Sequence, residues 1–200
     1  MTPVAAVVFD VDGTLYDAAR MRWALVPVFL ARSLAHPGEA ATAMSVVRWY
    51  RRAHERLRGL RPDQLGGDLE EAQLRLASEL SGVPREVVRR VVGDWFERAP
   101  LPALATSGRP GLADALSRLR AAGIKTAVLS DYPPLGKLQA LGVATAFDCV
   151  AWAQQAAIGV LKPDPKGLRE VLRQLGVAAE QAVGARAAED GVRARRAAGR

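Results

Sequence analysis

Two aspartates stand one residue apart where a short apolar run near the N-terminus ends. The run covers residues 4–9, and Asp10 and Asp12 follow it within the segment FDVDGTLYD. Its valine-rich composition is typical of a strand that is buried on both faces of a parallel sheet. Two carboxylates at the end of such a strand are unfavourable unless a nearby group neutralises them or a reaction uses them. The chain must therefore adopt a fold that brings a cation or a ligand to this strand end.

Strands and helices are predicted to alternate in the C-terminal half of the chain. Predicted helices cover residues 112–122 and 135–141, and predicted strands cover residues 125–129 and 147–153. This alternation indicates right-handed crossovers and a parallel sheet, in which ligands bind beyond the C-terminal ends of the strands. We therefore predict an α/β fold in which Asp10 and Ser130 lie at the same edge of the sheet.

The segment between these two parts, residues 17–107, has apolar residues at helical spacing and no alternation that indicates strands. We predict a helical insertion over these residues and an α/β core over residues 1–16 and 108–200. Asp17 is expected to be the N-cap of the first inserted helix. His36 and His54 are expected on the surface of the insertion. Its aromatic side chains are expected in its core rather than against a ligand: Trp23, Trp49, Tyr50, Trp95 and Phe96.

Charge and hydropathy restrict the partners of the chain. The formal net charge is +7, but the arginines are scattered among acids, and only the C-terminal VRARRAAGR clusters charge. That cluster has no aromatic residues on which bases could stack, so no specific nucleic-acid binding is expected. The apolar run WALVPVFLA is too short to span a membrane. Cys149 is the only cysteine, which excludes an internal disulfide and favours a cytoplasmic protein.

Four polar residues that are distant in sequence follow predicted strands or the loops beside them. They are Asp10, Asp12, Ser130 and Lys162. A wound parallel sheet would bring them together, because the ends of its strands share one edge. Two acids, a hydroxyl and an ammonium group form a suitable site for a divalent metal ion and a phosphate group.

The sequence resembles the haloacid dehalogenase-like superfamily, in particular its phosphatase branch with a helical cap, which includes phosphoglycolate phosphatase and β-phosphoglucomutase. FDVDGTLYD is similar to the first motif of that superfamily, AVLSDYP to the second, and GVLKPDPKGL to the third. The resemblance implies a Rossmann-like parallel-sheet core with an inserted α-helical cap. It also implies Mg²⁺-dependent hydrolysis of a small phosphorylated substrate through an aspartyl-phosphate intermediate.

The resemblance implies a role for each motif residue. Asp10 would be the nucleophile, and Asp12 would protonate the leaving oxygen and later deprotonate water. Ser130 would bind the transferring phosphoryl group, and Lys162 would neutralise its charge. Three further residues would contact the substrate: Gly13 and Thr14 in the turn after the strand, and Asp131 through its backbone N–H.

The metal ligands implied by the resemblance would be the Asp10 side chain, the Asp12 backbone carbonyl and an acid of a fourth motif, here Asp190. In that motif Ala185 follows Gly184, at the position where relatives have an aspartate. The strand before Gly184 looks short, and the chain stops at Arg200 where relatives continue into another strand and helix, so part of the core is expected to be missing. Loss of a carboxylate should weaken Mg²⁺ binding, because ligand count and charge set the affinity.

Three alternatives remain open from the sequence. The chain could be a catalytically weak or inactive relative that binds a ligand or partner. It could be a phosphomutase, which uses the same aspartyl-phosphate. A haloacid dehalogenase proper is less favoured, because carbon–halogen cleavage needs no acid at Asp12 to protonate the halide. The substrate and the oligomeric state are not readable from the sequence.

Overall fold

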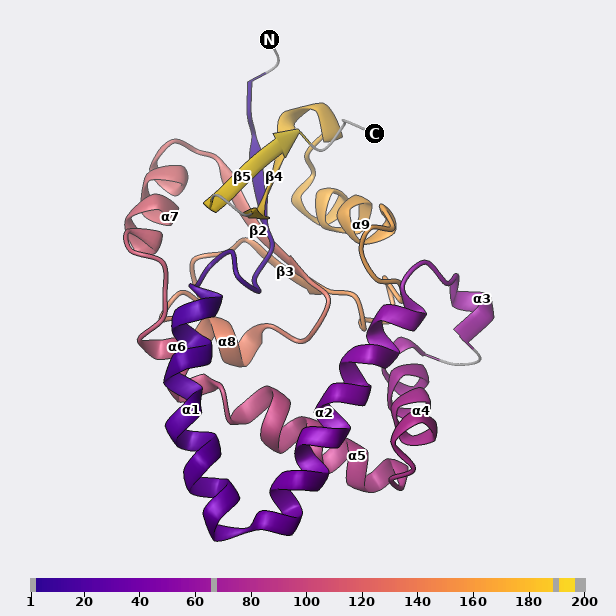
Figure 1. Cartoon of the computed structure of the whole chain (residues 1–200). Coiled ribbons are helices and arrows are strands. Elements are labelled where there is room, and N and C mark those ends of the chain that lie inside the picture. The colour runs from indigo at the N-terminus through magenta and orange to yellow at the C-terminus, as the bar shows by residue number, and fades with distance from the viewer. Residues whose placement is uncertain (1–2, 66–67, 189–190, 197–200) are drawn as a thin grey trace.

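The computed structural model describes residues 3–65, 68–188 and 191–196. Its sheet has the strand order β3-β2-β1-β4-β5, in which the first four strands are parallel and β5 is antiparallel to β4. Helices lie on both faces of this sheet, so the predicted α/β, Rossmann-like architecture is confirmed (Figure 1). The strands are β1 (Ala6–Phe9), β2 (Lys125–Ser130), β3 (Cys149–Trp152), β4 (Ala182–Ala188) and β5 (Gly191–Arg196).

The register of the sheet aligns the C-terminal ends of the central strands. Phe9 lies opposite Val128 of β2 on one side and opposite Ala185 of β4 on the other. The backbone N–H of Asp10 donates to the carbonyl oxygen of Ala185 at 2.9 Å, which extends this pairing by one residue. Asp10 is therefore held between β2 and β4 at the edge where parallel sheets bind ligands.

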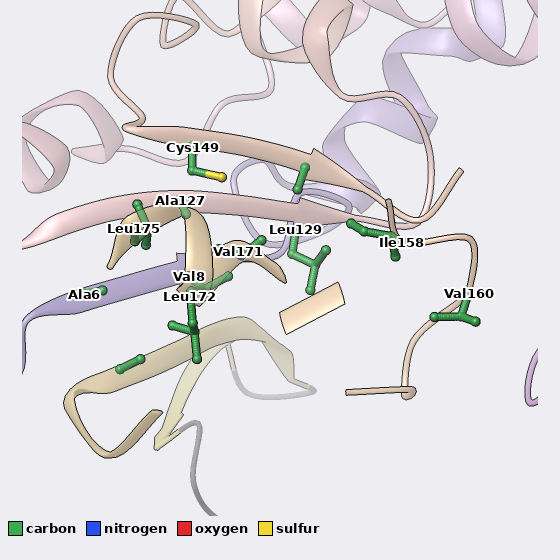
Figure 2. Close-up of a cluster of buried hydrophobic side chains, with 12 residues drawn as sticks. Ala6, Val8, Ala127, Leu129, Cys149, Ile158, Val160, Val171, Leu172 and Leu175 are labelled. Carbon is green, nitrogen blue, oxygen red and sulfur yellow. The ribbon is translucent and has the colours of Figure 1, made fainter. Parts of the chain in front are cut away.

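One face of the sheet is covered by α9 (Lys166–Leu175). Figure 2 shows the buried aliphatic side chains of the strands and this helix packed together, among them Val8, Leu129 and Leu172. The approach is close at Gly167, where an added Cβ would lie 3.1 Å from Cδ1 of Leu129. Burial of this apolar surface is the main term that stabilises the layer.

The other face is covered by short helices and by the segment that follows β1. Val11, Leu15 and Leu138 are buried in this second cluster. Because Val11 and Leu15 belong to the same turn as Asp10 and Asp12, the turn is anchored by its own apolar residues. The helices are α6 (Leu101–Ala105), α7 (Leu112–Ala121) and α8 (Leu135–Ala140).

The remaining helices all fall within residues 17–107. In Figure 1, α1 and α2 form a V that points away from β4 and β5. Asp17 caps α1, because its Oδ1 accepts the backbone N–H groups of Ala19 and Arg20 at 2.8 and 3.0 Å, which confirms that prediction. The bounds are α1 (Ala18–Ala35), α2 (Pro37–Leu57), α3 (Pro62–Leu65), α4 (Leu69–Ser81) and α5 (Arg85–Val91), and α5 continues as a π-helical turn over Val92–Arg98.

The core of these helices differs in part from the prediction. Tyr50 and Trp95 are buried in it as expected, but Trp23 is 77 % exposed on α1. Trp23 is exposed because α1 contacts α2 and α6 along other positions and leaves this face uncovered. Within the described residues, no helix combines the length and apolar character needed to cross a bilayer.

The end of the chain also differs from the expectation. Only Ala182 and Val183 of β4 precede Gly184, as the prediction of a short strand before Gly184 has it, but β4 continues to Ala188. β5 pairs along it from Val183 to Ala188, so this edge of β4 is covered by an antiparallel strand. Asp190, the predicted third metal ligand, lies outside the described residues.

Candidate active site

A cavity of about 1570 Å³ lies beyond the C-terminal ends of β1 and β2. The sheet side contributes Asp10, Asp12, Asp131 and Lys162 to its lining, and α1, α2 and the π-helical turn contribute residues from the opposite side. The cavity therefore brings together segments that are more than a hundred residues apart. Its position at the C-terminal edge of a parallel sheet is the usual one for a ligand site in this architecture.

Asp10 and Lys162 form an ion pair in this cavity. Nζ of Lys162 donates to Oδ1 of Asp10 and also lies 3.4 Å from the carbonyl oxygen of Leu129. The other carboxylate oxygen of Asp10 accepts the Thr14 hydroxyl at 3.3 Å. The fold thus places the predicted nucleophile against the predicted cation, although 152 positions separate them.

The turn after β1 is held in shape by backbone and side-chain contacts. Gly13 has a φ of +78°, a conformation that strongly favours glycine. Its carbonyl oxygen accepts a hydrogen bond from Nη2 of Arg109 at 3.0 Å, and the backbone N–H of Arg109 donates to Leu15 at 3.0 Å. Sequence reasoning missed Arg109, since no motif marks an arginine that supports a distant turn.

Asp12 has two partners that sequence reasoning also missed. Its Oδ1 accepts the Tyr16 hydroxyl at 2.7 Å and Nζ of Lys137 at 2.5 Å. Burial raises the pKa of Asp12, but the charge and hydrogen bond of Lys137 outweigh burial, so this pKa lies below its usual range. Burial and the charge of Asp12 raise the pKa of Tyr16, which keeps its hydroxyl a donor. Tyr16 follows Asp12 by four residues, whereas nothing in the sequence marks Lys137, which is in α8.

Ser130 and Asp131 end β2 and begin the next loop. The Ser130 side chain is 1 % exposed, and its Oγ accepts the backbone N–H of Tyr132 at 3.2 Å. Ser130 is not among the residues that line the cavity, but it directly follows Leu129, whose carbonyl oxygen lies 3.4 Å from Nζ of Lys162. As an acceptor, the hydroxyl contributes to the turn that positions Asp131 and keeps its own proton for a further partner. Binding of the phosphoryl group by Ser130 stays a prediction.

Asp131 connects the cavity wall to α2. Its Oδ1 accepts the backbone N–H of Lys162 at 3.2 Å, and its Oδ2 lies 3.5 Å from Nε2 of His54. Burial raises the pKa of Asp131, but the hydrogen bond from His54 and the charge of Lys162 outweigh it, so the pKa lies below its usual range. The prediction that His54 is a surface residue is wrong: it is only 5 % exposed, because this face of α2 packs on the loop after β2.

The described residues supply only part of a Mg²⁺ site. Within the described part of the chain, no three His, Cys, Asp or Glu side chains gather closely enough to hold a metal ion. Asp10 and Asp12 each bind a lysine, and Ala185 pairs with the end of β1 without offering a carboxylate. Mg²⁺ usually binds through one or two carboxylates together with water and substrate phosphate, and Asp190, the acid predicted to complete this set, lies outside the described residues.

Solved structures with the same architecture include enzymes of two kinds. The chain is similar to a 2-haloacid dehalogenase from Pseudomonas syringae (20 % identity, TM-score 0.58, covering 90 % of this chain and 76 % of that one). It is also similar to a phosphatase of the same superfamily from Thermococcus onnurineus (21 %, 0.54, 94 % and 80 %) and to CbbY from Rhodobacter sphaeroides in complex with phosphate (23 %, 0.52, 90 % and 76 %). At these identities the likeness shows the fold alone.

The family is shown by a match of the sequence itself. No curated protein is similar enough to this chain to count as a match. The sequence profile of the haloacid dehalogenase-like hydrolases matches residues 4–199, which includes all three motifs and nearly the whole chain. The chain therefore belongs to the haloacid dehalogenase-like hydrolase family.

Proposed function

We propose that this chain hydrolyses a small-molecule phosphoester through an aspartyl-phosphate intermediate on Asp10. The observation that supports this most directly is Asp12, which Tyr16 and Lys137 hold in the same cavity as Asp10. A second acid has a task in phosphoester cleavage, because the departing alkoxide must be protonated. A departing halide needs no proton, so the same acid would have no corresponding task in a dehalogenase.

The proposed reaction has two steps. The Asp10 carboxylate attacks phosphorus, and the bond between phosphorus and the ester oxygen breaks. Asp12, which receives a proton from the phosphoester monoanion when the substrate binds, protonates that oxygen, which leaves as an alcohol. Asp12 then removes a proton from water, whose oxygen attacks phosphorus and displaces Asp10, so that inorganic phosphate forms. Lys162 neutralises the charge that Asp10 and the phosphoryl group share. Because the described donors supply only part of a Mg²⁺ site, neither step is routed through the ion.

For the partners and the location of the protein, we propose what the sequence predicted. We propose a small phosphorylated molecule as the substrate, with no specific nucleic-acid partner. We also propose a cytoplasmic location, where a single thiol such as Cys149 stays reduced.

The proposed function is tested by the product that the purified chain releases. We expect release of inorganic phosphate from p-nitrophenyl phosphate and from alkyl phosphates, and no release of chloride from L-2-chloropropionate. Both products can be measured by colorimetric assays on the same preparation. Chloride release without phosphate release would overturn the proposal in favour of a dehalogenase.

A second candidate function rests on Ala185. A site without the fourth-motif carboxylate could bind a phosphorylated ligand and turn it over slowly or not at all. Saturable binding of inorganic phosphate, together with no release from any phosphoester, would favour this binding function over the hydrolase.

Ala185→Asp is expected to restore a carboxylate beside Asp10 and so to strengthen divalent-metal binding about tenfold or more. The binding is measured by a titration with Mn²⁺ followed by electron paramagnetic resonance, and phosphate release is then compared with and without Mg²⁺. Ala185→Asn is the matched control, since it has the same size without the charge. If Ala185→Asp unfolds at the same temperature as the parent but binds Mn²⁺ no better, the expectation is wrong and the binding function gains support.

A further inference from the structure

The cation that the proposed reaction uses belongs to a loop and not to a strand. Lys162 lies in a stretch of turns between β3 and α9. Its Nζ contacts Asp10, but a lysine side chain is flexible, so the position of the charge depends on where the main chain of Lys162 is held. The contacts of this loop therefore decide whether the ammonium group meets the nucleophile.

Leu161 attaches this loop to the helical segment of residues 17–107. It directly precedes Lys162, and it is 2 % exposed. Most of the other buried residues in its apolar cluster belong to that helical segment: Leu57, Leu65, Leu69 and Ala72. Because burial of a leucine side chain is favourable only where its neighbours exclude water, the packing of α2, α3 and α4 around Leu161 helps to fix the chain next to Lys162.

Asp131 makes the second attachment, since it joins the main chain of Lys162 to α2. Its Oδ1 accepts the backbone N–H of Lys162 at 3.2 Å, and its Oδ2 lies 3.5 Å from Nε2 of His54. A carboxylate only accepts hydrogen bonds, so this contact requires the ring proton of His54 on Nε2. Nη2 of Arg58 lies 3.4 Å from the same nitrogen, but Arg58 has Glu55 as its own ion-pair partner. Asp131 thus bridges Lys162 and His54.

His54 is buried in a way that a packing role does not explain. It is 5 % exposed, and its Nδ1 is buried with no hydrogen-bond partner among the described residues. A buried polar atom without a partner is unfavourable, so an apolar side chain of similar size would stabilise these helices more. The ring still has a defined position, because it packs on the Tyr132 ring at 5.0 Å, and the Tyr132 hydroxyl lies 3.4 Å from Nε2 of Gln73. What histidine provides here is therefore the contact of Nε2 with Asp131.

We propose that His54 and Asp131 are positioning residues for Lys162, so that the helical segment holds the cation of the site in place. His54 orients the Asp131 carboxylate so that it accepts the backbone N–H of Lys162. Asp131 and Leu161 then fix the main chain from which the ammonium group reaches Asp10. The inference rests on the proposed phosphoester hydrolysis for the task of Lys162, whereas the placement of Lys162 can be tested without any turnover.

His54→Met is expected to lower kcat about tenfold and to change KM by less than about threefold, because Lys162 acts mainly on the transition state. The loss should be equal for p-nitrophenyl phosphate and for alkyl phosphates, since Lys162 does not act on the leaving group. His54→Gln, whose side-chain amide can donate to Asp131, should recover most of the wild-type kcat. His36→Met is the matched control and should keep the full kcat, because His36 is the other histidine of the chain, is exposed and does not line the cavity.

A double-mutant cycle distinguishes positioning of Lys162 from a general loss of structure. In the Lys162→Met background, His54→Met should lower kcat little further, because the charge that His54 positions is already absent. A loss as large in this background as in the wild type would overturn the inference, and so would a His54→Met variant with the wild-type kcat.

Chemical labelling separates this inference from the proposed function, because it needs no substrate. The variants are treated with a trace of acetic anhydride, and mass spectrometry gives the acetylation of Lys162 relative to Lys166, an exposed lysine at the start of α9. A lysine held against Asp10 should react slowly, because its amine must leave this contact to reach the reagent. We expect His54→Met to raise the ratio about three- to tenfold, and His54→Gln and His36→Met to leave it unchanged.

Asp131→Ala, which removes the acceptor itself, should raise the labelling ratio at least as much as His54→Met, so the test does not depend on the folding of one variant. Thermal unfolding is measured on every sample. A raised ratio supports the positioning of Lys162 even if the wild type hydrolyses no phosphoester. An unchanged ratio in folded His54→Met or Asp131→Ala would reject it, whatever the outcome of the turnover assay.

Discussion

Asp10→Asn is expected to lower kcat for phosphoester hydrolysis by about 10⁴-fold or more, since it removes the nucleophile and no other described carboxylate is placed to replace it. The neutral amide cannot form an acyl phosphate, and its shape matches the carboxylate, so the fold should persist. Phosphate release from p-nitrophenyl phosphate is measured under saturating substrate, and thermal unfolding is measured on the same samples.

Asp12→Asn is the matched comparison for this variant. It keeps Asp10 and should still form the aspartyl-phosphate from an aryl phosphate, whose leaving group needs little help from an acid, but it should hydrolyse that intermediate slowly. Mass spectrometry of an acid-quenched reaction should then detect one added phosphoryl group in Asp12→Asn and none in Asp10→Asn. Substantial turnover by Asp10→Asn, or an adduct on another residue, would show that the nucleophile is not Asp10.

Lys162→Met is expected to lower kcat about 10²- to 10³-fold, because it removes the positive charge that contacts Asp10 from a partly buried site. Methionine keeps the length and much of the volume of the lysine stem, so the loss reports the charge. The loss should be similar for aryl and alkyl phosphates, since Lys162 acts on the phosphoryl group and not on the leaving group.

Lys137→Met is the control that distinguishes the role of Lys137 from that of Lys162. Lys137 holds the Asp12 carboxylate in place, so although its loss raises the pKa of Asp12, the loss of positioning should lower kcat for alkyl phosphates more than for p-nitrophenyl phosphate, by about tenfold. If both lysine variants respond to the leaving group in the same way, the separate roles proposed for Asp10 and Asp12 are wrong.

Local patterns were enough to predict much of the fold. The valine-rich run before Asp10 and the alternation of strands and helices after residue 108 predicted the parallel sheet, because strand and helix periods are properties of a few neighbouring residues. Asp17 was predicted as an N-cap on the same basis. The same reasoning failed for the C-terminal strands, because we interpreted this stretch through the fourth motif.

The sequence predicted residues of the candidate site only where they belong to a recognisable motif. Asp10, Asp12, Gly13 and Thr14 are neighbours in the chain, so their types and spacing identify them together. Tyr16 follows them within one turn, but a tyrosine at that position is more often a core residue. Lys137 is in α8, His54 and Arg51 are in α2, and Arg109 is in the loop before α7. No local pattern distinguishes these residues from surface or packing residues.

The sequence by itself determined the family, the order of the elements and the position of Asp10 at the end of the first strand, since these depend on local composition and motifs. Only the tertiary structure decided which cations meet the two aspartates and that the Ser130 hydroxyl accepts a hydrogen bond within its own turn. It also decided that α2 brings His54 and Arg51 to the cavity. The physical reason is that an ion pair depends on distance in space, and the packing of elements that are distant in sequence sets that distance.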